Sequence, residues 1–319
     1  MSTTRSRDNS VVAEGTHRGA YGVAEWGLML GSSGIWGASF LLIATSLDHF
    51  APGIVTFVRV SVGAVVLTAF AGARKPIARG DWPRVALLAV LWLAFPMTLY
   101  AIAQERISSG LAGMLSASIP VFTALLTAVL LGRLPAPIHR LGIAIGAVGI
   151  VLLGLPALHA GSNSAYGVLL ILVACVSYAL AFNLAVPLVQ RYGSMPVFWR
   201  ALWLAVPMTI PLAIAGLPSS SFGLGSLLAN VTLGAGGTAI AFVLLLTLAG
   251  RAGATRSSMV TYLEAVFAFV LGTIVRHEPV HVLEVMGCAV VLVGAWLATR
   301  GPGVAVTDAG VASRRSAPR

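Results

Sequence analysis

The feature that most constrains this chain is a series of long apolar runs separated by short polar gaps. A helix needs about 20 apolar residues to cross a bilayer, and a helix satisfies its backbone polar groups where no water can. Ten runs approach or reach that length. They predict ten transmembrane helices, over residues 26–46, 52–71, 85–104, 110–131, 138–155, 166–188, 196–216, 225–249, 254–275 and 280–299.

The composition supports an all-α polytopic membrane protein. Of the 319 residues, 58% are hydrophobic and only 9% are charged, whereas a soluble domain has about 25% charged residues. Too few polar side chains remain to cover a surface that faces water. The polar ends, residues 1–25 and 300–319, are predicted to be disordered tails, and no cleavable signal peptide is visible.

The basic residues predict an orientation in the membrane. If successive spans alternate in direction, sixteen of the twenty basic residues fall on the side of both termini. Arg106 and Arg276 fall on the other side, and Arg59 and Arg200 fall within spans. The positive-inside rule then places both termini in the cytoplasm and the protein in the plasma membrane. The net charge of +10 therefore reports topology, and we expect no nucleic-acid partner.

The two halves of the chain resemble each other at a constant offset of 145 residues. A five-helix unit over 26–155 thus returns over 166–299. Five is odd, so the second copy enters the membrane from the opposite side, which makes a 5+5 inverted repeat of the kind found in transporters. The repeat is carried by pairs such as Met114 and Met259, Phe122 and Phe267, Gly142 and Gly287, Gly149 and Gly294, and Leu152 and Leu297.

Three stretches resemble the EamA-type transporters of the drug/metabolite transporter superfamily: WGASFLLIATSL (36–47), SSGLAGMLSASIPVFTALLTAVLLG (108–132) and AGATRSSMVTYLEAVFAFVLGTIVRHEP (252–279). The resemblance covers roughly residues 26–300. It implies ten helices and export of small metabolites such as amino acids. The chain departs from the family pattern at Ala265, where proline is usual, at Arg133, where an acid is usual, and at His277, where glycine usually precedes Glu278.

Glu264 lies near the middle of the span 254–275. A central acid costs about 2.5–3.5 kcal/mol on insertion scales, so it is expected to face the bundle interior or a wet cavity. Two interpretations stay open. The carboxylate either contacts a substrate amine or relays a proton, or it is structural and bonds a neighbouring helix.

Arg59 and Arg200 lie near the starts of two spans that correspond in the repeat. An arginine close to a membrane edge can extend its head group to the interface. The alternative is a role in gating or in binding a substrate carboxylate, for which an amino acid would suit an Arg–Glu pair.

Other polar and aromatic side chains within the spans are candidates for lining a cavity. The predicted set, together with Glu264, is Trp36, Tyr100, Gln104, Tyr178, Asn183 and Tyr262. Simple packing is the competing interpretation for the aromatic residues. Backbone kinks or hinges are predicted at Pro120 and in the GAGG run, at Gly234, Gly236 and Gly237.

An enzyme and a channel are the alternatives to a transporter. The run GSSG (31–34) fits an intramembrane serine protease, but all six histidines fall in tails, loops or span ends. No charge ring or filter loop favours a channel. Cys175 and Cys288 lie apart within apolar runs, and neither a metal nor another cofactor is expected.

The sequence therefore predicts a secondary transporter, not an enzyme, that exports a small metabolite by alternating access. Amino acids or related compounds are the expected substrates, and the direction of transport comes from the resemblance alone. A facilitative uniporter or channel for another small solute is the alternative. Proton coupling stays open, as does the choice between monomer and homodimer.

Overall fold

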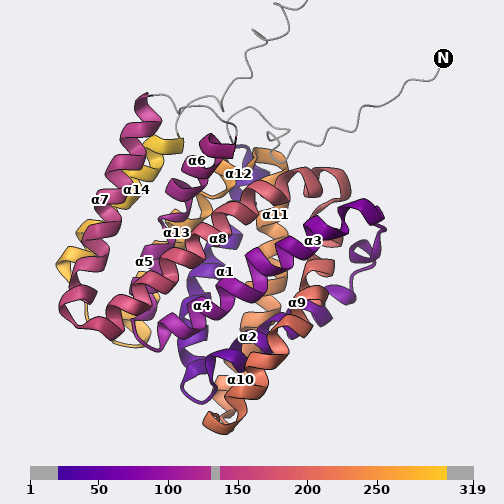
Figure 1. Cartoon of the computed structure of the whole chain (residues 1–319), viewed down its shortest axis with the longest axis horizontal. Helices are drawn as coiled ribbons and strands as arrows, with labels where there is room; N and C mark the ends of the chain where they lie inside the picture. Colours follow the sequence, from indigo (N-terminus) through magenta and orange to yellow (C-terminus); the bar gives the residue numbers. More distant parts are fainter. Residues whose placement is uncertain (1–20, 131–136, 300–319) are drawn as a thin grey trace, which may run out of the picture.

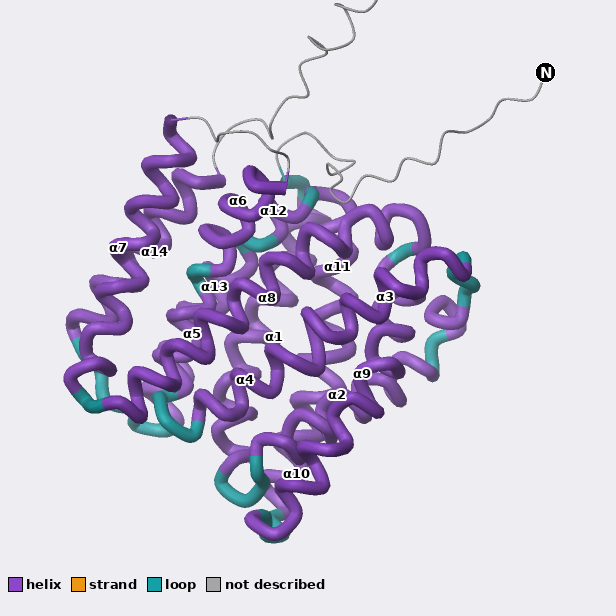
Figure 2. Tube along the Cα trace, viewed as in Figure 1, coloured by secondary structure: helices purple, strands orange, loops and turns teal. Residues whose placement is uncertain are grey.

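The computed structural model describes residues 21–130 and 137–299. Within those ranges the chain is entirely helical, with no strand (Figure 2). The tails expected at 1–25 and 300–319 fall outside the described residues, except for positions 21–25, and so does Arg133. The first helix begins at Val23, three residues before the predicted boundary, because the Glu25 carboxylate accepts a bond of 3.0 Å from the Gly22 amide and caps it.

Seven helical segments of the described chain are long and apolar enough to cross a membrane. They are Val23–Leu47 (α1), Arg79–Gln104 (including α3, Trp82–Leu88, and α4, Phe95–Gln104), Ser109–Leu130 (α5, Ser109–Ser116, and α6, Ile119–Leu130), Pro137–His159 (α7), Ser162–Tyr192 (α8), Ser194–Ser219 (including α9, Ser194–Gly216) and Leu224–Ala252 (α10, Leu224–Thr232, and α11, Ala241–Ala252). Three shorter apolar helices are Pro52–Thr68 (α2), Val260–Val275 (α13) and Val282–Thr299 (α14); a single turn, Ala254–Ser257 (α12), precedes α13.

Three of the long segments are interrupted where backbone bonds are lost or rearranged. The segment Arg79–Gln104 contains a π-helical stretch, Ala89–Ala94, just before Pro96, which has no N–H to donate. The segment Ser109–Leu130 is broken at Ala117 and Ser118, next to Pro120. The segment Leu224–Ala252 passes through a π-helical stretch, Leu233–Ile240, which holds the glycines of the GAGG run. Such stretches are frequent at functional sites.

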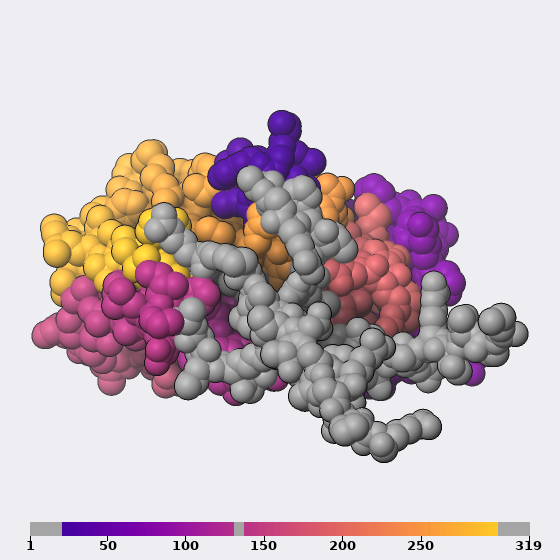
Figure 3. All heavy atoms as spheres, turned by 90° about the horizontal axis from the view of Figure 1, so that it is seen from above, coloured from indigo at the N-terminus to yellow at the C-terminus, as the bar shows by residue number. Residues whose placement is uncertain are grey.

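Helices α7 and α14 pack along each other at one edge of the bundle (Figures 1 and 3). A Cβ added at Gly142 would lie 2.6 Å from the Gly294 carbonyl oxygen, and one added at Gly149 would lie 2.9 Å from the Gly287 carbonyl oxygen. Only glycine permits such close approach of two backbones. These contacts cross over between the two repeats. Gly142 faces Gly294, which is the counterpart of Gly149 at the 145-residue offset, and Gly149 faces Gly287, which is the counterpart of Gly142. A local two-fold axis produces this exchange.

Polar contacts mark two ends of the bundle. At the end where α1 begins, Arg251 pairs with Glu25 at 3.2 Å and Arg191 pairs with Asp81 at 2.9 Å. At the opposite end, Arg276 pairs with Asp48 at 3.0 Å. In each of these ion pairs both residues come from parts of the chain that alternating spans would place on the same side of the membrane.

At this opposite end, Glu278 holds the start of α5. Its carboxylate accepts bonds from the Ser109 amide (2.9 Å), the Ser109 hydroxyl (2.7 Å) and the Gly110 amide (2.8 Å). The preceding residue, His277, has a φ of 52°, in the left-handed region that favours glycine. This conformation gives a physical reason for the glycine that resembling transporters have at this position.

Candidate functional site

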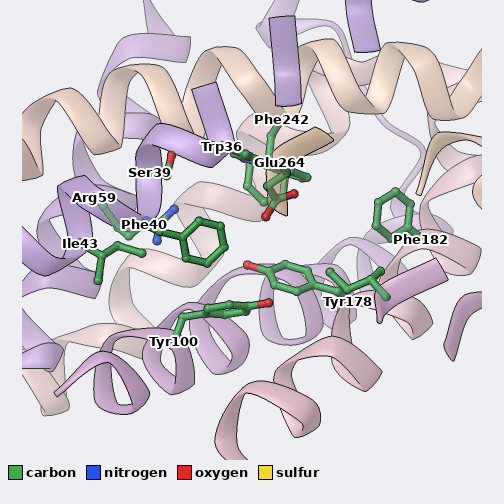
Figure 4. Close-up of a pocket in the computed structure, with 11 residues that line it drawn as sticks. Trp36, Ser39, Phe40, Ile43, Arg59, Tyr100, Tyr178, Phe182, Phe242 and Glu264 are labelled. Atoms are coloured by element: carbon green, nitrogen blue, oxygen red, sulfur yellow. The ribbon is translucent and has the colours of Figure 1, made fainter. Parts of the chain in front are cut away.

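A narrow cavity lies inside the helix bundle (Figure 4). Its volume is about 40 Å³, which is room for about three water molecules. Seven helices contribute to its wall: α1, α2, α4, α6, α8, α11 and α13. The lining residues are Trp36, Ser39, Phe40, Ile43, Arg59, Tyr100, Ile119, Tyr178, Phe182, Phe242 and Glu264.

Arg59 is the basic residue of this wall. Its side chain is buried, with 5% of the residue exposed, so it lies inside the helix bundle and not on its surface. Its Nε donates to the Thr238 hydroxyl at 3.1 Å, which fixes the guanidinium on the π-helical stretch. Among the described residues no carboxylate pairs with it, so both terminal guanidinium nitrogens remain available to a ligand.

Glu264 is the acidic residue of the wall, and it too is 5% exposed. Its Oε2 atom is buried and has no hydrogen-bond partner among the described residues. It forms no ion pair with Arg59. A buried charge without a partner costs several kcal/mol, and two groups of opposite charge line this one cavity without pairing with each other.

The rest of the wall is mainly aromatic. The Trp36 indole donates to the Gly237 carbonyl at 2.9 Å, and its ring meets Phe242 edge-on with centroids 4.7 Å apart. Tyr100 and Tyr178 lie with centroids 5.8 Å apart, and Figure 4 shows their phenol groups pointing into the space below Glu264. The Tyr100 hydroxyl lies 2.6 Å from the Ser116 hydroxyl. Aromatic walls of this kind favour an apolar or aromatic moiety on the ligand.

The structure brings together five of the residues singled out from the sequence: Trp36, Arg59, Tyr100, Tyr178 and Glu264. Arg59 brings α2 into the wall of the cavity.

Other predicted residues lie elsewhere. The Asn183 Oδ1 accepts a hydrogen bond from the Thr127 hydroxyl at 2.8 Å, and its Nδ2 donates to the Ala179 carbonyl at 3.0 Å. Neither polar atom of the Gln104 side chain has a partner among the described residues. Tyr262 is not part of the wall, and Arg200 lies in a separate groove at the bundle surface.

The predicted hinge residues lie at two of the helix interruptions. Pro120 is the second residue of α6, directly after the break in the segment Ser109–Leu130. Gly234, Gly236 and Gly237 lie in the π-helical stretch that also carries Thr238, the anchor of Arg59. Movement at either place remains a prediction.

Sequence reasoning missed six wall residues: Ser39, Phe40, Ile43, Ile119, Phe182 and Phe242. Five of them are apolar residues within apolar helices, where the pattern does not distinguish the inner face from the lipid face. Helical spacing gave a signal for Ser39 and Phe40, which lie one turn after Trp36, and for Phe182, which lies one turn after Tyr178.

The two serines of the GSSG run, on which the protease alternative rests, donate hydrogen bonds to helix backbones. The Ser33 hydroxyl donates to the Val260 carbonyl at 2.8 Å, and the Ser32 hydroxyl donates to the Leu28 carbonyl at 2.7 Å. Cys175 and Cys288 are separate, buried thiols. Within residues 21–130 and 137–299, no group of three or more potential metal ligands comes together.

Curated relatives resemble this chain over most of its length. It is 27% identical to the uncharacterized transporter YdfC of Bacillus subtilis, covering 82% of this chain and 86% of YdfC. It is also 27% identical to a probable terminal-alkyne amino-acid exporter of Streptantibioticus cattleyicolor, covering 87% and 93%. Identity to the uncharacterized inner membrane transporter YedA of Escherichia coli is 27%, covering 84% and 88%.

A chain of known crystal structure has the same fold, with a TM-score of 0.61 over 92% of this chain and 99% of that chain. Its identity of 19% extends the likeness to the fold alone. The sequence model of the EamA-like transporter family matches residues 26–155 and again residues 165–300. Together the two matches cover most of the chain, which is thus a multi-pass membrane protein that belongs to the EamA-like transporter family.

Proposed function

We propose that this transporter exports amino acids or closely related amino compounds through the central cavity. The observation that carries the proposal is the presence of Arg59 and Glu264 in one aromatic-walled space, each without an ion-pair partner among residues 21–130 and 137–299. A zwitterion supplies a carboxylate for the guanidinium and an ammonium for the carboxylate. One relative, at 27% identity, is named as a probable amino-acid exporter, which supports the same class.

The substrate has to enter by a change of shape, because a cavity for about three waters does not admit an amino acid. We infer that two five-helix halves rock about the cavity, the first over 26–155 and the second over 166–299. Two observations support an inverted repeat: the same family model matches twice, and the α7–α14 glycine contacts cross over. In this proposal α2, α13 and α14 also cross the membrane, which makes ten spans.

The protein is further proposed to lie in the plasma membrane with both termini in the cytoplasm. The basic residues support this orientation, since most of them fall on one side of the alternating spans.

A second candidate role for Glu264 is proton transfer, favoured by the bare Oε2 atom in a cavity that holds only a few waters. In that case the carboxylate alternates between proton and substrate. A facilitative carrier would use the same contacts without a proton.

The test is counterflow in proteoliposomes that contain the purified protein and a panel of labelled solutes. Zwitterionic amino acids, amines without a carboxylate, carboxylates without an amine, and sugars form the panel. The proposal expects exchange of the zwitterions and at least tenfold slower exchange of the other three classes. Equal rates for amines and zwitterions would exclude the paired recognition. An imposed pH gradient then separates the two candidate roles: a proton-coupled carrier concentrates substrate, and a facilitative carrier only equilibrates it.

A further inference from the structure

A second hollow is lined by residues at the start of α3 and in the first half of α9. These two helices pack against each other (Figure 1). Its volume is about 580 Å³, and it shares no lining residue with the central cavity. Its lining is Trp82, Trp199, Arg200, Trp203 and Leu204. Trp82 and Trp203 are 39% and 43% exposed, so the groove opens outward from the bundle.

Arg200 is the charged group of this groove. Its Nη1 donates to the carbonyl oxygens of Ala73 (3.2 Å) and Pro196 (3.0 Å). Its Nη2 and Nε make no hydrogen bond within the described part of the chain, and no carboxylate there pairs with it. The guanidinium carbon lies 5.2 Å from the Trp199 ring centroid and 6.0 Å from that of Trp82. The Arg200 guanidinium is therefore fixed in the groove by Nη1, while its Nη2 and Nε groups can still donate to a ligand.

The tryptophans are held in place as well. The indole N–H groups of Trp199 and Trp203 both donate to the Thr68 hydroxyl, at 2.9 and 3.2 Å. One acceptor at the end of α2 thus fixes two rings of the groove wall. Tryptophan is enriched at membrane–water interfaces, where one part of the ring system is apolar and the N–H is polar.

The surroundings of the groove are positively charged. Exposed Arg74, Lys75 and Arg79 lie in the segment that leads into α3. The acid of that segment, Asp81, is already engaged by Arg191 at 2.9 Å and by the Tyr192 hydroxyl. In Figure 3 this purple segment lies beside the salmon start of α9, at the end of the bundle where α1 begins.

We propose that this groove binds an anionic phospholipid. The phosphate takes the free donors of Arg200, and the first part of an acyl chain lies along Trp203 and Leu204. A basic pocket at the cytoplasmic level of a membrane protein suits anionic headgroups, and a phosphate matches the fork of a guanidinium. The site does not depend on which solute the central cavity carries.

The test is native mass spectrometry of the delipidated protein in detergent, with phosphatidylglycerol or phosphatidylcholine of the same acyl chains. The wild type is expected to bind one phosphatidylglycerol at least fivefold more tightly than phosphatidylcholine. Arg200→Gln is expected to lose about fivefold in phosphatidylglycerol affinity, which is the effect of one basic residue near the surface. Arg140→Gln, an exposed arginine on α7 away from the groove, is the matched control and is expected to keep the preference.

A second measurement uses quenching of tryptophan fluorescence by brominated phosphatidylglycerol. Quenching is expected to fall in Trp203→Phe and to be insensitive to added inorganic phosphate, since the acyl chain contributes to binding. Arg200→Lys retains the positive charge and replaces the glutamine variant in the test if that variant does not fold. Its preference for phosphatidylglycerol over phosphatidylcholine is expected to stay within threefold of wild type. Equal binding of the two lipids, equal loss in Arg200→Gln and Arg140→Gln, or displacement by phosphate alone would each overturn the proposal.

Discussion

Arg59 of α2 and Glu264 of α13 open into the same cavity without forming an ion pair. Each is 5% exposed, and the Glu264 Oε2 atom has no partner within the described residues. Opposite charges that share a cavity but stay apart leave room for a ligand that has both a carboxylate and an ammonium group.

A zwitterionic substrate is therefore expected to stabilise the folded protein. At a concentration of 100 times Kd the free energy of unfolding rises by about 2.7 kcal/mol, which appears as an increase in Tm. Arg59→Gln and Glu264→Gln are each expected to lose most of that increase, because one end of the ligand is left unpaired. The measurement is a thermal shift of detergent-solubilised protein with and without the substrate found by counterflow. Glu105→Gln, which alters an exposed side chain, serves as control; the idea fails if all four proteins respond alike.

The Thr238 hydroxyl positions Arg59 rather than contacting the solute itself. Thr238→Val keeps the shape but removes the acceptor of the 3.1 Å bond from Arg59 Nε. We expect a loss of about tenfold in substrate affinity, because the guanidinium is no longer held toward the cavity. Thr238→Ser restores the acceptor and is expected to transport within threefold of wild type. If the valine and serine variants have the same KM in efflux assays, the bond does not position Arg59.

Glu278 is expected to contribute strongly to stability through its three bonds to the start of α5. A carboxylate at a helix N-terminus also benefits from the helix dipole. Glu278→Ala is expected to lower the free energy of unfolding by about 2–3 kcal/mol, measured by denaturant titration in mixed micelles. Glu105→Ala is expected to change it by less than about 1 kcal/mol, since that acid makes only an exposed pair with Arg106. Equal effects of the two substitutions would contradict this role of Glu278.

His277→Gly is expected to stabilise the protein. A side chain at a φ of 52° costs about 1 kcal/mol, which glycine avoids, although the greater freedom of glycine in the unfolded chain offsets part of the gain. The same titration should show an increase of up to about 1 kcal/mol. His277→Ala, which keeps a Cβ at this φ, should show none, and a gain in the alanine variant would mean that the imidazole and not the backbone is responsible.

The glycines between α7 and α14 are expected to tolerate no added methyl group. Gly142→Ala and Gly149→Ala place a Cβ within 2.9 Å or less of the facing backbone, so each should cost about 1–3 kcal/mol. Gly27→Ala is the control: it lies in α1 with nothing within 4 Å of its added Cβ. At that position the higher helix propensity of alanine should leave the free energy of unfolding unchanged or raise it by up to about 1 kcal/mol. Equal stability of the three variants would show that the two helices can separate freely.

The sequence was sufficient to predict the helical membrane fold, because length and hydropathy alone identify helices that can cross a bilayer. It also predicted that Glu264 lies inside the bundle, since an acid in mid-span is costly against lipid. Depth within the predicted spans selected two wall residues, Trp36 and Tyr178, whereas Tyr262, chosen on the same ground, lies outside the wall.

The same reasoning could not separate Arg59 from Arg200. Both were expected near the start of corresponding spans, yet Arg59 lies at the middle of α2 and reaches Thr238, whereas Arg200 lies in the first third of α9 against surface tryptophans. The difference depends on the π-helical stretch that presents Thr238, and a local rearrangement of helix hydrogen bonds has no clear sequence signal. Phe242 was missed for a related reason, because α11 is apolar on several faces and its inner face emerges only from packing.

The small size of the central cavity has a mechanical consequence. A space for about three waters has to expand before any organic solute fits. Loading therefore requires the helices around the cavity to move apart. That outward step does work against the lateral pressure of the surrounding lipid, which the return to the empty form gives back, so lateral compression of the bilayer is expected to favour the empty form.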